Sequence, residues 1–204
     1  DKARGIATVS GGLANITTGS GSDTLTATSA FGTTAITLDG GAGDDRFVFD
    51  TATQMAAASL IGGLGTDTLA LGQATVLAND DAFQKVTGMD VLQAAATGES
   101  SFVLASNAQA AGIRTVIGGA DKITINASAY TVDVTLDASA NSNTTANNGA
   151  TLLGGSGNDA FMLLNNNVLS VSSVVGGLGS DSLTFSEDGL SITDENFTRI
   201  ADVE

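Results

Sequence analysis

A short phrase built from glycine and aspartate recurs along the chain and carries the residues best suited to hold a cation. Its full form, Gly-Gly-x-Gly-x-Asp-x-apolar, begins at Gly40, Gly62, Gly154 and Gly176. The copy at 18–25 lacks only the first glycine, and the copy at 118–123 is one residue short. Glycine permits positive φ and lets the chain turn its carbonyls inward, while aspartate adds a compact anionic oxygen. The pattern therefore predicts binding of a hard cation, above all Ca²⁺.

The spacing of the copies indicates how an ion would be shared. One loop supplies only part of a Ca²⁺ shell of about six to eight oxygens, so we expect two stacked loops to hold each ion. The copies at 18, 40 and 62 are 22 residues apart, and so are those at 154 and 176. This spacing pairs 18–23 with 40–45, 40–45 with 62–67, and 154–159 with 176–181.

The expected metal ligands are the aspartate at the sixth position of each copy and the carbonyls at the first, third and fifth. The carboxylates are those of Asp23, Asp45, Asp67, Asp159 and Asp181, with Asp121 of the short copy as a further candidate. The carbonyls are those of Gly40, Ala42, Asp44, Gly62, Leu64, Thr66, Gly154, Ser156, Asn158, Gly176, Leu178 and Ser180. The Asp44 carboxylate itself is expected to face solvent. The alternative is that the loops are ion-free corners in which aspartate only caps turns.

Composition excludes several other chemistries. The chain has 204 residues, 26 Gly, no Pro, no Cys, no His and a formal net charge of −15. Without His or Cys it has no imidazole or thiolate metal site and no His-activated nucleophile, so we assign no catalytic residues and expect no enzyme. Seven Lys and Arg against 22 Asp and Glu argue against nucleic acid as a partner. No apolar run approaches the roughly 20 residues of a membrane span.

A longer repeat lies above the short one. A shift of 114 residues aligns 40–90 with 154–204 without a gap, with 14 identities in 51 positions. We therefore predict two tandem copies of a unit of about 114 residues. The first, 1–92, is clipped at its N-terminal side, and the second, 93–204, is continuous with it.

Short β-branched or aliphatic runs separate the loops, among them 47–49, 69–71, 102–104 and 132–136. They are too short for helices, and several alternate with a period of two. With a fixed rung length, they predict an all-β fold, a right-handed parallel β-roll or β-solenoid.

Three segments could interrupt the strands. Short helical turns are expected at 80–86 and 194–200, each opening with an acidic cap. The alanine-rich segment 52–59 fits either a helical turn or a loop. Tyr130, the single tyrosine, is expected to pack within a rung.

The Gly-Asp loops resemble those of the RTX, or hemolysin-type, calcium-binding β-roll family of bacterial proteins exported by type I secretion. The loops that carry the resemblance amount to roughly 30–40 residues, and the remainder fits as rung body. The family usually repeats the nonapeptide back to back, whereas the loops here are 22 residues apart and lie at one edge of each coil. The resemblance therefore implies fewer ions than a typical β-roll. The sparse loops and the Ala/Thr/Ser-rich body are most similar to bacterial surface-layer proteins and giant adhesins.

The resemblance implies a calcium-dependent structural segment of a secreted bacterial cell-surface protein. Ca²⁺ between coils would drive folding and rigidity outside the cell, with neighbouring copies in a surface lattice as further partners. The alternative is a non-catalytic C-terminal β-roll module of a type I-secreted enzyme. An adhesin module for sugar or ice would need an aromatic cluster or a long flat threonine face, and a β-helix lyase would need clustered basic residues. The sequence shows neither.

Overall fold

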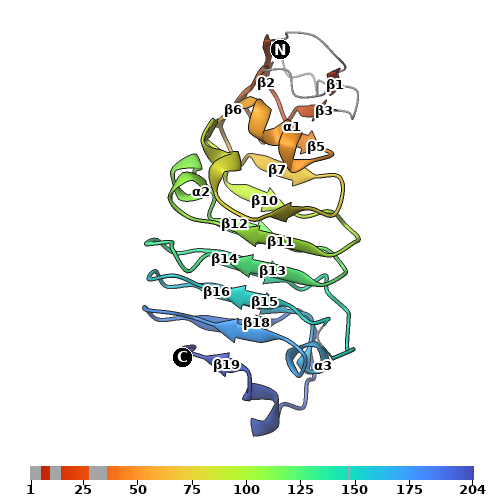
Figure 1. Cartoon of the computed structure of the whole chain (residues 1–204), viewed down its shortest axis with the longest axis vertical. Coiled ribbons are helices and arrows are strands. Elements are labelled where there is room, and N and C mark those ends of the chain that lie inside the picture. The colour runs from red at the N-terminus through yellow and green to blue at the C-terminus, as the bar shows by residue number, and fades with distance from the viewer. Residues whose placement is uncertain (1–5, 10–14, 28–35, 147) are drawn as a thin grey trace.

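The computed structural model describes residues 6–9, 15–27, 36–146 and 148–204. In it, the chain winds into coils that stack along the long axis from the N-terminal to the C-terminal end (Figure 1). Strands of successive coils pair in parallel and, over the described residues, form three sheets. The prediction of a predominantly β fold of stacked parallel sheets is confirmed.

One long sheet runs the length of the described chain, and two shorter sheets complete the coils. The long sheet contains β1 (Ile6–Val9), β3 (Thr24–Ala27), β5 (Arg46–Phe49), β7 (Thr68–Leu71), β10 (Val91–Gln93), β12 (Thr115–Ile117), β14 (Thr135–Ala138), β16 (Ala160–Leu163) and β18 (Ser182–Phe185). The N-terminal sheet contains β2 (Asn15–Ser20), β4 (Thr37–Ala42), β6 (Ser59–Leu64) and β9 (Val86–Thr87). The C-terminal sheet contains β8 (Val76–Leu77), β11 (Ser100–Val103), β13 (Ile123–Asn126), β15 (Thr151–Leu153), β17 (Ser173–Val175) and β19 (Ile200–Ala201).

The register of the sheets stacks apolar side chains into one continuous core. In the long sheet, Leu25 lies opposite Phe47 and Phe47 opposite Leu69, and all three are fully buried. The C-terminal sheet contributes a matching column that includes Phe102 and Ile125. Because strand side chains alternate, each coil turns its apolar set inward and its Thr- and Ser-rich set outward. Tyr130 is buried in this core, as expected.

Short helices occupy several corners. They are α1 (Ala52–Ala57), α2 (Ser106–Ala111), α3 (Asn166–Leu169) and the 3₁₀ turns η2 (Asp81–Phe83) and η3 (Asp194–Phe197). The segment 52–59, left open by the sequence, is thus mainly helical, and Thr51 and Gln54 form a capping box at its start.

The two expected helical turns are present as η2 and η3, but neither has an acidic side chain bonded to its N-terminal amides as a cap. Thr193 caps η3 in a capping box with Asn196, and Asp80 makes no side-chain cap to η2. The Asp80 carboxylate instead accepts hydrogen bonds from the amides of Ala105, Asn107 and Ala108 at the start of α2 in the next coil.

The elements recur at the offset of the sequence repeat. β5, α1, β6, β7 and β9 correspond to β16, α3, β17, β18 and β19, whose first residues lie 114 positions later. The predicted boundary between residues 92 and 93 falls within β10, and the core continues across it. No helix in the described ranges is long and apolar enough to span a membrane.

Candidate metal centre

Five of the Gly-Asp loops, all but the short copy at 118–123, stack at one corner of the solenoid, where each leads into a strand of the long sheet. In the first group, Gly19 pairs with Gly41, and Gly41 with Gly63. In the second group, the amide of Leu178 donates to the carbonyl of Gly155 at 2.9 Å. The loop pairs expected from the 22-residue spacing therefore lie on adjacent coils.

The sixth-position aspartates form a column along this corner, each directly before a strand of the long sheet. In chain order, the positions of this column are Asp23, Asp45, Asp67, Asp90, Arg114, Val134, Asp159, Asp181 and, after the last of these strands, Glu204. The five motif aspartates are at most 3% exposed. Carboxylates this deeply buried need hydrogen bonds, a counter-charge or a proton.

Hydrogen bonds link the column into two ladders. Asp45 Oδ1 accepts from the amide of Asp23, and Asp67 Oδ1 from that of Asp45, both at 2.8 Å. Asp90 Oδ2 accepts from the amide of Asp67 at 2.8 Å and ends the first ladder.

The second ladder starts at the amide of Val134, which donates to Asp159 Oδ1 at 2.9 Å. Asp181 Oδ1 then accepts from the amide of Asp159 at 2.7 Å. The ladder ends at Glu204 Oε2, which accepts from the amide of Asp181 at 3.1 Å. In both ladders each carboxylate reaches back to the preceding coil.

Fifth-position residues make a second set of bonds in the opposite sense. Asp44 Oδ1 accepts from the amide of Thr66 at 2.8 Å, and Asn158 Oδ1 from that of Ser180 at 2.9 Å. Here the earlier coil supplies the acceptor. In these two loop pairs, the carboxylate of the later loop and the side chain of the earlier loop each accept a hydrogen bond from the other loop.

Two ladder carboxylates keep an oxygen without a partner. Asp45 Oδ2 and Asp67 Oδ2 are buried and have no hydrogen-bond donor in the structure. Burial is the largest influence on both groups and raises the pKa of each above its usual value, as it does for Asp159. Leaving a buried polar atom unsatisfied costs about 1–3 kcal/mol, and more when the group is charged. These two oxygens thus lack the partner that their charge requires.

The first glycine of each full loop explains where those oxygens point. A side chain at Gly40 would collide with Asp45 Oδ2 and with the carbonyl oxygen of Gly62 in the next coil. Gly154 stands in the same place beside Asp159 Oδ2 and the carbonyl of Gly176, although this Oδ2 accepts a hydrogen bond from the amide of Gly155 at 2.7 Å. We call this pairing of a carboxylate Oδ2 with a carbonyl from the next coil, at a glycine Cα, an oxygen cradle.

The copy at 18–25 departs from this arrangement. Its first residue is Thr18 instead of glycine, and Thr18 Oγ1 donates to the carbonyl of Gly40 at 2.6 Å. The side chain therefore fills the position that is open in the other loops, and the Gly40 carbonyl already has a donor.

The remaining predicted ligands lie farther out. Leu64 and Leu178, at third positions, have side chains that are 74% and 72% exposed. The Leu64 carbonyl accepts from the amide of Gly43 at 2.7 Å, so it bonds to the neighbouring loop. The Asp44 side chain is exposed, as expected, although it accepts the bond from Thr66 described above. First and sixth positions thus converge in the cradles, while third and fifth positions form the loop tips.

Asp121 lies at a different corner from the other candidate ligands. Its loop follows β12 and leads into β13, so it leaves the long sheet instead of entering it. Its Oδ2 accepts from the amide of Gly98 at 2.7 Å. The structure does not bring Asp121 together with the ladder aspartates.

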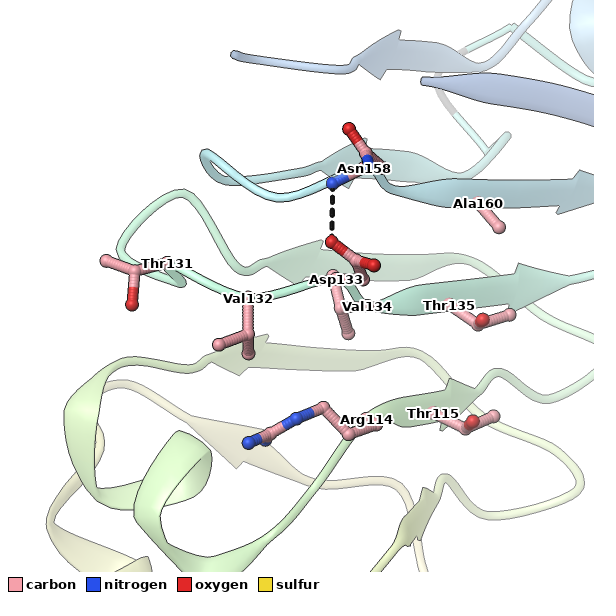
Figure 2. Close-up of a pocket in the computed structure, with 9 residues that line it drawn as sticks. All are labelled: Arg114, Thr115, Thr131, Val132, Asp133, Val134, Thr135, Asn158 and Ala160. Atoms are coloured by element: carbon pink, nitrogen blue, oxygen red, sulfur yellow. Dashed lines mark hydrogen bonds between the residues drawn. The ribbon is translucent and has the colours of Figure 1, made fainter. Parts of the chain in front are cut away.

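Between the ladders the corner is built differently. Helix α2 and the turn at 127–133 replace the Gly-Asp loops, and Arg114 and Val134 take the column positions. An open hollow of about 670 Å³ lies here (Figure 2). Arg114 lines it and donates to the carbonyls of Gln109 and Ile113, while Asp133 accepts from the amide of Asn158 at 2.7 Å. A basic residue with an exposed side chain thus takes the column position where the acids are interrupted.

Sequence reasoning missed the segments that end the two ladders. Asp90 and Glu204 are ladder acceptors, and the carbonyls of Gly88 and Asp202 lie in cradles with Asp67 and Asp181. None of these residues belongs to a Gly-Asp phrase. The offset of 114 residues, which relates Gly88 to Asp202 and Asp90 to Glu204, was the available signal.

The donor set determines which cation the cradles suit. No group of three or more acidic side chains converges within the described part of the chain. In each cradle a cation would meet one carboxylate oxygen and one main-chain carbonyl oxygen, hard donors of the kind that Ca²⁺ prefers. Comparison of the chain with protein-family models, curated proteins and solved structures finds no match.

Proposed function

We propose that this chain is a calcium-dependent structural segment of a secreted bacterial cell-surface protein, a right-handed β-roll of the RTX kind. The observation that carries the proposal is the pair of unpartnered, buried oxygens, Asp45 Oδ2 and Asp67 Oδ2, each beside a carbonyl from the next coil. A bound Ca²⁺ supplies two positive charges and accepts oxygens from two coils at once.

Charge supports the same conclusion. The chain carries a formal net charge of −15, and its ladder aspartates are stacked on adjacent coils. Mutual repulsion opposes this stacking, and cations between the coils would offset it. Ion binding to the folded state alone adds directly to folding stability.

The cell-surface location is proposed from the metal chemistry and from the absence of cysteine in the sequence. Extracellular modules bind Ca²⁺ at about 10⁻⁴–10⁻³ M, which suits a chain that orders only outside the cell. A chain without disulfides also needs another means of stabilisation there.

The test compares far-UV circular dichroism and thermal melting in EGTA, in about 10 mM CaCl₂ and in about 10 mM MgCl₂. We expect Ca²⁺ to raise Tm by many degrees, with Mg²⁺ far less effective because it favours a rigid octahedral shell. Bound metal is counted by inductively coupled plasma mass spectrometry after gel filtration. Identical melts in EGTA and CaCl₂, together with no bound Ca²⁺, would overturn the proposal.

A further inference from the structure

Each ladder ends on a segment that lacks the Gly-Asp phrase. The first ends at Gly88-Met89-Asp90, and the second at Asp202-Val203-Glu204. These segments share no residue identity, yet they occupy equivalent places, each one coil after a full loop. Asp90 and Glu204 accept hydrogen bonds from the amides of Asp67 and Asp181, as the aspartates in the rest of each ladder do.

The oxygens at the end of the first ladder form a cradle. A side chain at Gly62 would collide with the carbonyl of Gly88, and it would lie 2.6 Å from Asp67 Oδ2. Asp67 is fully buried, and this Oδ2 has no hydrogen-bond partner. The unpartnered oxygen therefore faces a carbonyl supplied by a segment outside the motif.

The end of the second ladder has the same arrangement. A side chain at Gly176 would collide with Asp181 Oδ2 and with the carbonyl of Asp202. Asp202 has φ of 52°, the only positive φ at a non-glycine residue in the described ranges, whereas Gly88 at the equivalent position has φ of 65°. Aspartate is one of the few residues other than glycine that adopts this left-handed conformation, because its short polar side chain can bond locally. Retaining it here keeps the Asp202 carbonyl in the cradle.

The number of calcium sites expected from pairing of the Gly-Asp phrases therefore differs from the number of cradles in the structure. Motif pairing expects three shared sites, one of them between 18–23 and 40–45. In that pair Thr18 fills the open position and donates to the Gly40 carbonyl. The cradles with glycine at the first position number four in the described chain, and they lie at Gly40, Gly62, Gly154 and Gly176. In the cradle at Gly154, the carboxylate oxygen also accepts from the amide of Gly155.

We propose that Gly88–Asp90 and Asp202–Glu204 each complete a calcium site with the preceding loop, so that each ladder carries two sites. The terminal sites take Asp67 Oδ2 with the Gly88 carbonyl, and Asp181 Oδ2 with the Asp202 carbonyl. This inference rests on the proposed function and goes beyond it, because it assigns metal binding to segments without the motif.

The second ladder offers a clean test by native mass spectrometry of the protein in Ca²⁺. Asp159→Asn, Asp181→Asn and the double variant each remove one Oδ2 per site, while the remaining amide oxygen can still accept the ladder bond. Asp159→Asn also loses the hydrogen bond that Oδ2 accepts from the amide of Gly155 at 2.7 Å. We expect each single variant to lose one ion and the double variant to lose two. Asp188→Asn, an exposed acid in the same coil as Asp181, removes the same charge and should lose none.

If the two aspartates shared a single ion, the double variant would lose only one, which would overturn the inference while leaving the proposed function standing. A wild-type protein that binds no Ca²⁺ would overturn the proposed function itself. Counts are made on protein that keeps the wild-type circular-dichroism spectrum in Ca²⁺. Where a variant does not fold, the wild-type count decides: four or more ions support the terminal sites, and three or fewer refute them.

Discussion

Replacing Asp67 with asparagine should stabilise the calcium-free protein and reduce the stability that the protein gains from calcium. Asp67 Oδ1 accepts the amide of Asp45 at 2.8 Å, whereas Oδ2 is buried without a partner. In Asp67→Asn the remaining oxygen keeps the first bond. The new amide nitrogen replaces the unpaired anionic oxygen and can donate to the nearby Gly88 carbonyl.

The size of the effect follows from that single atom. An unsatisfied buried polar atom costs about 1–3 kcal/mol, and in a chain of this length each kcal/mol shifts Tm by roughly 2–4 °C. In EGTA, Asp67→Asn should therefore melt roughly 2–12 °C above the wild type. When the Ca²⁺ concentration is about 100 times Kd, the loss of one site removes roughly 2.7 kcal/mol of stabilisation. The difference in Tm between Asp67→Asn and the wild type should therefore narrow or change sign in Ca²⁺.

Differential scanning calorimetry of the wild type and three variants in both buffers measures this. Asp67→Ala loses both oxygens and should melt below the wild type in each buffer, because the amide of Asp45 is left unpaired. Asp81→Asn, an exposed acid outside the ladders, should melt like the wild type. If Asp67→Asn melts below the wild type in EGTA, the unpartnered oxygen is not destabilising and the reasoning is refuted. If Asp67→Asn gains as much stability from Ca²⁺ as the wild type does, Asp67 is no ligand.

Three further predictions follow from the same corner and its neighbours. Burial raises the pKa of three ladder aspartates in the folded state, so the metal-free fold holds more protons than the unfolded chain between the unfolded pKa of about 3.9 and the raised values. The stability contributed by this proton binding is present below the unfolded pKa and is lost as pH rises through the folded pKa. Tm in EGTA should therefore be higher at pH 4.5 than at pH 7.5. A Tm that rises with pH would contradict this prediction. Thr18→Gly should open a further cradle and add one Ca²⁺ by native mass spectrometry, whereas Thr18→Ser, which keeps the hydroxyl, should not; equal counts for both variants would show that Thr18 does not block a site. Asp80→Ala should lower the free energy of unfolding by about 1–2 kcal/mol because it removes the cap of α2, and the urea midpoint should fall. Asp194→Ala, at the equivalent place 114 residues later, should change the urea midpoint little. Equal falls in the two variants would refute the capping role of Asp80.

The loops and the stacked fold could be predicted because their residue types are fixed by local geometry. A side chain at Gly40 or Gly154 collides with neighbouring oxygens, so glycine recurs there in the sequence. The strands between loops show the alternation of a half-buried sheet. The spacing of 22 residues then places the loops on adjacent coils.

Other parts depend on contacts between distant residues and were not predictable in the same way. The cap of α2 comes from Asp80 in the preceding coil, and Ser106–Ala111 shows no apolar period of its own. The carbonyls of Gly88 and Asp202 contribute main-chain atoms, which leave no signature in residue type. Asp121 resembled a ligand because its loop copies the phrase, yet the copy lies at the opposite end of a strand in the long sheet.

The interruption at Arg114 and Val134 gives the solenoid a mechanical joint. Amide-to-carboxylate bonds connect Asp23 through Asp90 and Val134 through Glu204, but the Arg114 amide donates to the main-chain carbonyl of Asp90. Across this joint, neighbouring coils are held by sheet hydrogen bonds, by core packing and by side-chain bonds such as those of Gln109 to Thr131 and of Asp121 to the Gly98 amide, none of which lies in a cradle. Since each coil of a solenoid contacts only its neighbours, unravelling that starts in one ladder would halt at this joint. If the ladders bind calcium as proposed, a fall in calcium concentration would unravel the solenoid in steps and leave a folded middle from which both ladders could rewind.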